Sequence, residues 1–323
     1  MDDQPVERRT VLKGAALLAA GTIGGVRMRE GAAAQPVPFS AGTAPPTLEV
    51  PANACDCHMH IYDSRFPYAP NATLRPPEAT VADYRLLQQR LGLTRMVVVT
   101  PSSYGTDNSC TLAAIAEFGP VARGIAVVDP GVTDAELQRL GGLGIRGIRF
   151  NLSVGGVTTI EMIESLARRV HEQGWHVQVV IPGDELAKQE ALFQRLPATL
   201  VLDHMGRFPA SAGVDHPAFS VIRRLLDGGR TYVKLSGAYL NSQVGPPGYG
   251  DTVEVGQALV QAAPERMLWG SDWPHPTITT ANKPLPDDAG LLDLLAEWAP
   301  DEATRRRILV ENPEVVYGFP KSA

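Results

Sequence analysis

The sequence predicts an α/β fold, a single-domain (β/α)8 barrel over residues 52–320. Short apolar runs rich in β-branched residues alternate with longer runs of helical spacing, eight times along the chain. Polar side chains follow the expected strands at their carboxyl ends, where barrel enzymes carry their chemistry. An open doubly wound sheet is the alternative, but it would have a glycine-rich turn after the first strand, and this sequence has none there.

The elements follow one another in a regular order. The first strand is expected at 54–61, and a helix starts behind Thr80, an N-cap residue, with apolar side chains at helical spacing. Thr133 caps a helix with acidic residues in its first turn, where the helix dipole favours them. The other strands are expected at 96–99, 124–128, 145–150, 175–181, 199–202, 232–235 and 267–269. The other helices are expected at 110–118, 160–173, 185–196, 218–226, 253–262, 291–298 and 304–310. Residues 237–250, with adjacent prolines and several glycines, form a candidate lid.

The N-terminal segment has the composition of an export signal. Arg8 and Arg9 form a twin-arginine pattern, residues 14–26 are weakly apolar, and Ala32–Ala34 offer a small-residue cleavage site. The apolar run is shorter than the ~20 residues that span a bilayer. We therefore predict a twin-arginine signal peptide at 1–34, a periplasmic protein with no membrane segment after signal removal, and an extended linker at 35–51. A tail with a chance arginine pair is the alternative.

The net charge of -6 and the lack of a basic stripe exclude non-specific nucleic-acid binding. The first strand is unusual for its polar face. In a regular strand, Asp56, His58 and His60 share one face, and the apolar side chains of Met59 and its neighbours lie on the other. A carboxylate with two imidazoles suits the inner face of a barrel near its mouth.

Two further residues are expected to join this pair, because His204 follows the sixth strand and Asp272 the eighth. Three imidazoles and a carboxylate can hold one Zn²⁺ and leave a position for water. Alternatively, the imidazoles polarise a carbonyl while Asp272 takes a proton from water. Arg149, at the end of the fourth strand, either binds an anion or pairs with Asp129 or Asp203.

Six motifs follow one another between Asp56 and Tyr317. They are Asp56-x-His58-x-His60, residues 105–108, 123–130, 146–151 and 203–207, and Trp269-Gly270-Ser271-Asp272 with the residues up to 276. Together these motifs resemble the amidohydrolase superfamily, and more narrowly its pyrone-dicarboxylate lactonase branch, which includes sulfomuconolactone hydrolases and an aldarolactone isomerase.

The resemblance implies a role for each matched residue. Asp272 would be the general base, and His58, His60 and His204 would polarise the lactone carbonyl or hold a metal. Arg149 would bind a substrate carboxylate, since its planar fork suits that group. The other substrate-binding residues would be Ser102, Tyr104 and Asn151.

The chain departs from the dicarboxylate lactonases at several binding positions. Gly155, Val180, Leu74 and Leu240 stand near places where that branch has arginine or tyrosine. The strand-five histidine of the wider superfamily is absent too, which favours one metal at most. We therefore predict a lactonase that opens a small anionic lactone, such as a sulfo- or carboxymuconolactone, in aromatic-compound degradation. A lactone isomerase, a metal-dependent decarboxylase and a non-catalytic periplasmic binding protein are the alternatives.

Overall fold

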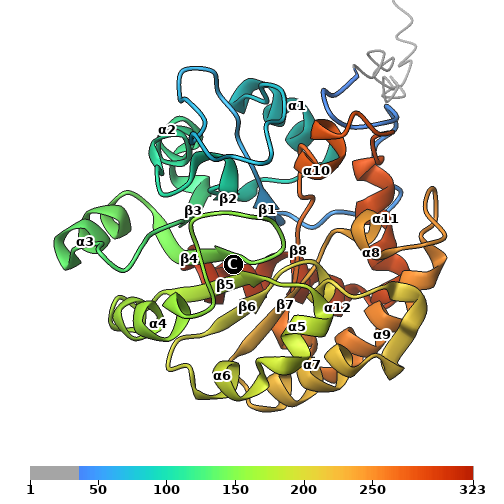
Figure 1. Ribbon diagram of the computed structural model, residues 1–323. Coiled ribbons are helices and arrows are strands. Elements are labelled where there is room, and N and C mark those ends of the chain that lie inside the picture. The colour runs from blue at the N-terminus through green and yellow to red at the C-terminus, as the bar shows by residue number, and fades with distance from the viewer. Residues whose placement is uncertain (1–35, 323) are drawn as a thin grey trace, which may run out of the picture. The chain divides into compact units, whose positions relative to one another are not determined.

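The computed structural model describes residues 36–322, and in this part of the chain eight parallel strands form a barrel in the order β1 to β8 (Figure 1). The predicted (β/α)8 fold is confirmed, while the predicted signal peptide lies outside the described residues. No described helix has the length and apolarity needed to cross a membrane. The strands are β1 Cys55–Met59, β2 Arg95–Val99, β3 Ala122–Ala126, β4 Ile145–Asn151, β5 His176–Val180, β6 Leu200–Leu202, β7 Thr231–Leu235 and β8 Met267–Trp269.

Helices surround the strands and connect each to the next (Figure 1). The larger ones are α1 Val81–Leu91, α2 Ser109–Phe118, α3 Asp134–Gly142, α4 Met162–Glu172, α7 Pro217–Asp227, α9 Val253–Ala262 and α11 Asp288–Trp298. The shorter ones are α5 Gly183–Lys188, α6 Glu190–Arg195, α8 Ala238–Asn241, α10 Pro276–Thr280, α12 Glu302–Arg306 and α13 Asn312–Tyr317. Thr80 caps α1 in a reciprocal capping box with Asp83, as its place in the sequence predicts. The single helix expected at 185–196 is two helices, and α8 and α10 were not predicted.

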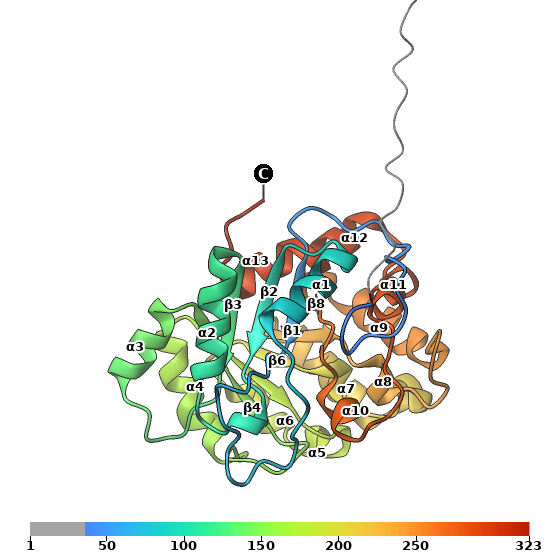
Figure 2. The ribbon, with the colours of Figure 1, turned by 90° about the horizontal axis from the view of Figure 1, so that it is seen from above.

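Two apolar clusters separate the inside of the barrel from its outer layer. The inner cluster takes alternate strand residues, among them Val97, Val99 and Ile125, and is closed by Tyr317 at the end of α13 and by Phe319 beyond it. The outer cluster joins the intervening strand residues to the helices. In Figure 2, α13 and the C-terminus lie at one end of the barrel, and α10 and α5 at the other. Tyr317 and Phe319 therefore close the barrel at the end opposite the carboxyl ends of the strands.

Strand β1 is irregular, which corrects the predicted face of Asp56. Its register to β2 shifts between Asp56 and Met59. Asp56 therefore points outward and accepts hydrogen bonds from the Tyr84 hydroxyl of α1 (3.1 Å) and from the Ser271 backbone and hydroxyl (3.0 and 2.6 Å). Cys55 and Cys57 lie in the inner cluster instead of facing the helices. A β-bulge changes which residues share a face, so alternation alone could not place these side chains.

This outward position makes Asp56 a structural residue, and we expect Asp56→Asn to destabilise the fold. All four groups that contact its oxygens donate hydrogen bonds: the backbone of His58, the backbone and hydroxyl of Ser271, and Tyr84. In asparagine, the amide N–H groups would face some of these donors and leave them without an acceptor, which we expect to lower the free energy of unfolding by about 2 kcal/mol. Urea unfolding at pH 7 measures the change, with Asp134→Asn, an exposed ion-pair partner of Arg169, as the control expected within about 0.5 kcal/mol. Equal unfolding midpoints for the two variants would contradict the assignment.

The segment before β1, predicted as an extended linker, has no helix or strand over residues 36–51 and packs on the barrel. Val37 and Leu48 are buried, and the Pro38 carbonyl accepts a hydrogen bond from the Trp273 indole (2.8 Å). The backbone N–H groups of Thr47 and Leu48 donate to Asp293 on α11 (3.0 and 2.8 Å). Proline-rich composition predicted an extended chain, but it carried no information about what the chain packs against.

Candidate active site

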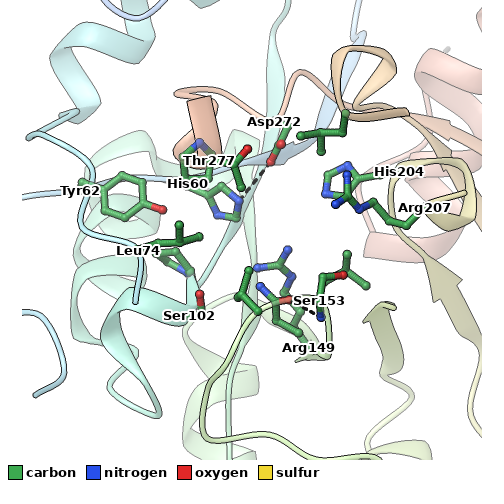
Figure 3. Close-up of a pocket in the computed structure, with 16 residues that line it drawn as sticks. His60, Tyr62, Leu74, Ser102, Arg149, Ser153, His204, Arg207, Asp272 and Thr277 are labelled. Carbon is green, nitrogen blue, oxygen red and sulfur yellow. Dashed lines mark hydrogen bonds and ion pairs between the residues drawn. The ribbon is translucent and has the colours of Figure 1, made fainter. Parts of the chain in front are cut away.

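Three side chains predicted to be catalytic meet at the carboxyl end of the barrel. The His58 Nε2 atom lies 3.3 Å from His60 Nε2 and 3.5 Å from Asp272 Oδ1. His60 Nε2 is 3.3 Å from the same Asp272 oxygen (Figure 3). All three side chains are buried. His58 and His60 come from β1 and its end, and Asp272 from the loop after β8, so closure of the barrel brings them together.

His204, the fourth predicted catalytic residue, joins them from the loop after β6. Its ring centroid is 4.8 Å from that of His58, and its Nδ1 contacts the Ser236 hydroxyl at 3.0 Å. The contact with Ser236 leaves Nε2 for the pocket, where Figure 3 shows the ring near Arg207. The predicted convergence of His58, His60, His204 and Asp272 is what the structure shows.

The loops after β6 and β8 hold their functional side chains with an unusual backbone. His204 and Arg207 after β6, and Asp272 and His275 after β8, have φ values of 53°, 54°, 62° and 59°. This left-handed conformation is uncommon for residues with a Cβ atom and is concentrated at functional sites. The fold thus holds local strain in the two loops that deliver a candidate base and a candidate imidazole.

A buried polar cluster supports His58 from the inside of the barrel. Asp203 lies 3.3 Å from His58 Nδ1, 3.3 Å from Arg149 Nε and 3.5 Å from Lys234 Nζ. Gln178 completes it, since it donates to Asp203 (3.0 Å) and accepts from Lys234 (2.8 Å). Arg149 therefore makes the predicted pair with Asp203, and not the alternative one with Asp129. Because only its Nε engages Asp203, its two terminal nitrogens remain for the pocket.

Burial and charge set the protonation of these groups. Burial lowers the pKa of His204 to about 4 and also holds the pKa of His58 well below its usual range. Burial alone would raise the pKa of Asp203 and of Asp272. Attraction to the His58 ring and to Lys234 prevails for Asp203, and attraction to the rings of His204, His60 and His58 prevails for Asp272, so the pKa of each carboxyl is held below its ordinary range. Both carboxylates are therefore ionised, as a base that accepts a proton from water must be.

The same residues fit a single cation. His60 Nδ1 lies 2.7 Å from the Val99 carbonyl, so it carries the ring hydrogen and leaves Nε2 as an acceptor. That atom faces His58 Nε2 and the Asp272 carboxylate, so several acceptors converge, and a proton or a cation must lie between them. Ligand atoms of His58, His204 and Asp272 lie within 4.8 Å of one another. Imidazole nitrogens and a carboxylate are ordinary zinc ligands.

A pocket opens beside this centre, with about 470 Å³ of space when the solvent at its mouth is counted. Its lining includes four predicted catalytic or binding residues besides His60 and His204, namely Asp272, Arg149, Ser102 and Asn151. Leu74, Val180 and Leu240, the apolar departures from the dicarboxylate lactonases, line it too.

Tyr104, predicted to bind substrate, does not line this pocket. It is buried, and its hydroxyl accepts a hydrogen bond from the Asp63 backbone N–H at 3.1 Å. We therefore do not retain it among the substrate-binding residues. Tyr62, from the end of β1, lines the pocket in its place.

Two further residues of the site, Arg207 and Tyr239, were not among the predicted site residues. Arg207 lines the pocket three residues after His204, so a second guanidinium faces the substrate space (Figure 3). Tyr239, on α8, donates from its hydroxyl to Asp272 Oδ2 at 2.5 Å. The signal for Arg207 was its place in the motif at 203–207. Tyr239 had none, because a four-residue helix has no detectable periodicity.

Comparison with known proteins agrees with this geometry. A family model described as Amidohydrolase matches residues 55–319. Three curated relatives match over most of both chains. A 4-sulfomuconolactone hydrolase of Rhizobium radiobacter is 36% identical and covers 86% of this chain and 94% of its own. A 2-pyrone-4,6-dicarboxylate hydrolase of Comamonas testosteroni is 34% identical, with coverages of 86% and 94%. A D-galactarolactone isomerase of Agrobacterium fabrum (strain C58) is 34% identical, with coverages of 85% and 94%.

A solved structure shares the fold. The apo crystal structure of an Agrobacterium tumefaciens protein is 32% identical, with a TM-score of 0.79, and covers 86% of this chain and 100% of its own. The resemblance to the pyrone-dicarboxylate lactonase and sulfomuconolactone hydrolase branch is confirmed by the relatives. They include both lactone hydrolases and a lactone isomerase, so the chain lies among enzymes that act on lactones.

Proposed function

The chain belongs to the amidohydrolase family, and we propose that it opens a small anionic lactone by hydrolysis. The observation that carries this proposal is the position of Asp272. One oxygen of its carboxylate faces His58 and His60, and the same side chain lines a pocket that also holds Arg149. A base beside polarising imidazoles, with an arginine across the pocket, suits water attack on the carbonyl of an acidic substrate.

The steps are those of ester hydrolysis. Water attacks the ring carbonyl carbon, and its proton passes to Asp272. The imidazoles donate to or polarise the carbonyl oxygen on which negative charge develops, and such stabilisation is worth about 3 kcal/mol per donor. The bond from carbon to the ring oxygen then breaks, and the proton on Asp272 passes to that oxygen. The product has one new hydroxyl and one new carboxylic acid, which releases its proton to solvent and becomes a carboxylate.

The charge of the site supports an acidic substrate. Leaving the imidazoles aside, Arg149, Arg207 and Lys234 place three cations against the two carboxylates Asp203 and Asp272. Two arginines at one pocket suit a substrate with two acidic groups, and the apolar wall formed by Leu74, Val180 and Leu240 suits an unsaturated ring. We propose a muconolactone that carries a sulfonate or a second carboxylate, formed in the degradation of aromatic compounds.

Turnover in ¹⁸O-labelled water tests hydrolysis. The panel is 4-sulfomuconolactone, 4-carboxymuconolactone, 2-pyrone-4,6-dicarboxylate and D-galactarolactone. We expect one of the muconolactones to react fastest and its product to gain one labelled oxygen in a carboxylate, read by mass spectrometry. A product without label would establish the second candidate, isomerisation, which the relationship to the D-galactarolactone isomerase favours. Binding without turnover across the panel would favour the non-catalytic binding protein. Release of CO2 would favour the decarboxylase.

Arg149→Lys tests the substrate-binding assignment. Lysine keeps the charge but loses the planar fork, so we expect kcat/KM on the best lactone to fall about 100-fold, mainly through KM. Arg146→Lys is the matched control, since Arg146 is on the same strand but donates to the backbone carbonyls of Gly141 and Ile145, away from the pocket. A value for Arg149→Lys within threefold of the control would refute the role.

One zinc ion per chain at most is proposed as the cofactor. His58, His60, His204 and Asp272 would hold it, and it would supply a Lewis acid at the carbonyl oxygen. The strand-five histidine ligand of the wider superfamily is replaced here by the apolar run Val179, Val180 and Ile181, and Val180 lines the pocket. Plasma mass spectrometry of protein purified without added metal tests this. A ratio near two metals per chain would contradict it.

Export to the periplasm by the twin-arginine route is proposed from residues 1–34. The support is the Arg8-Arg9 pair ahead of an apolar run and a small-residue site. We expect a full-length fusion to a reporter to appear in the periplasmic fraction, and the double variant Arg8→Lys/Arg9→Lys to stay in the cytoplasm. Wild-type fusion confined to the cytoplasm would refute the proposal.

A further inference from the structure

The short helix α8 contacts both loops that carry the candidate catalytic residues. It follows β7 directly, and β7 lies between β6 and β8 in the barrel. Tyr239 donates to Asp272 Oδ2 at 2.5 Å, on the β8 side. Asn241 Nδ2 donates to the backbone carbonyl of His204 at 2.8 Å, on the β6 side. Leu240, between them, lines the pocket. Three consecutive residues therefore serve three parts of the site. Tyr239 contacts Asp272, Leu240 lines the pocket, and Asn241 donates to the loop that carries His204.

The position of α8 is fixed by its start. Gly237 has a φ of 66°, and a Cβ atom there would lie 2.9 Å from His204 Nδ1. Any larger residue would displace the imidazole. Ala238 and Asn241 are buried. The first residues of the segment predicted as a lid thus belong to the packed body of the site.

The Tyr239 ring is itself held in place. It packs edge-on against the His275 ring, with centroids 5.0 Å apart and an interplanar angle of 88°. His275 Nε2 lies 3.2 Å from Asp288 Oδ2, and both of those side chains are fully buried. The hydroxyl of Tyr239 is therefore aimed at Asp272 by packing that does not involve the substrate.

This contact distinguishes the two oxygens of the Asp272 carboxylate. Oδ2 accepts from Tyr239, whereas Oδ1 faces His58 and His60. The terminal torsion of an aspartate is broad, so without a partner on Oδ2 the plane of the carboxylate can turn and move Oδ1 away from its place opposite His58 and His60. The backbone is fixed separately, because Asp272 N–H donates to the His58 carbonyl at 2.7 Å.

We propose that Tyr239 is a positioning residue that holds Asp272 with Oδ1 towards the attacking water. The proposal rests on the proposed function, because it assigns the second oxygen of the same base. It predicts that loss of the hydroxyl slows the chemical step and leaves substrate binding unchanged, since Tyr239 does not line the pocket.

Tyr239→Phe tests this, because it removes one oxygen and keeps the ring against His275. With 4-sulfomuconolactone, or the fastest lactone of the panel, we expect kcat to fall at least tenfold and KM to stay within twofold. Tyr84→Phe is the matched control, since its hydroxyl also donates to a buried aspartate, Asp56, but outside the site. Its kcat should stay within twofold. Leu240→Ala, in the same helix, should instead raise KM. Each variant is assayed at a temperature at which circular dichroism shows it folded.

The outcomes separate this proposal from the proposed function. If Asp272→Asn loses turnover while Tyr239→Phe keeps kcat within twofold, the positioning role is refuted and the base assignment stands. If Tyr239→Phe changes only KM, the positioning role is refuted as well. If Asp272→Asn itself keeps its turnover, the base assignment is refuted, whatever the tyrosine variant does.

Discussion

Asp272→Asn is expected to lower kcat on the best lactone by about 10³-fold and to leave lactone binding equal or tighter. General-base catalysis typically contributes 10²–10⁴-fold, and an amide cannot accept the proton of water. Binding should not weaken, because the change removes a negative charge from a pocket that receives an anion. The fold should tolerate it, since Asp272 has a φ of 62°, a conformation that asparagine adopts readily. Stopped-assay kinetics give kcat, and titration calorimetry gives the affinity.

Asp129→Asn is the matched control. This exposed carboxylate follows β3 at the same end of the barrel, and within residues 36–322 it accepts only from the Gly131 backbone, at 2.7 Å. Metal content is measured in the same preparations, so that loss of a ligand is separated from loss of a base. A kcat for Asp272→Asn within tenfold of the control, at equal metal content, would remove Asp272 from the mechanism.

The barrel was predictable because its strands are buried on both faces. Runs such as 96–99 read as apolar throughout, and only a covered parallel sheet makes such runs stable. The set of polar residues at the mouth of the barrel was predictable for a related reason. Polar residues such as His204 and Asp272 stand directly after apolar strands, and parallel strands end at one edge. The convergence of these two with His58 and His60 therefore follows from topology.

The rest depends on backbone detail that has no sequence period. The bulge in β1 turns Asp56 outward, although it stands two residues before His58. Arg207 and Tyr239 reach the site through a left-handed residue and a four-residue helix. Neither feature recurs at a regular spacing, so no periodicity of the sequence indicates it. Residues within three positions of a strand end, such as His204 and Asp272, were predicted well, and residues that depend on a bulge or lie further along a loop were not.

Lys234→Met is expected to destabilise the protein by about 3–5 kcal/mol, the usual cost of removing one partner from a buried ion pair. The Lys234 side chain is fully buried, and its ammonium lies 3.5 Å from Asp203 and donates to Gln178 at 2.8 Å. Methionine fills the volume but leaves the Gln178 oxygen without its donor and Asp203 with Arg149 as its remaining cation. Urea unfolding gives the loss as a lower midpoint at an unchanged slope.

Two comparisons identify the cause. Lys188→Met, on α5, removes an exposed pair with Glu185 and should cost less than about 1 kcal/mol. The double variant Lys234→Met/Asp203→Asn should be less destabilised than the sum of its single variants, because it removes the charge that the lysine neutralises. Additive effects would show that the two residues do not interact. The same cluster contacts His58 through Asp203 Oδ1 at 3.3 Å. Lys234→Met should therefore also lower kcat where it is still folded, because the imidazole that faces Asp272 loses its support.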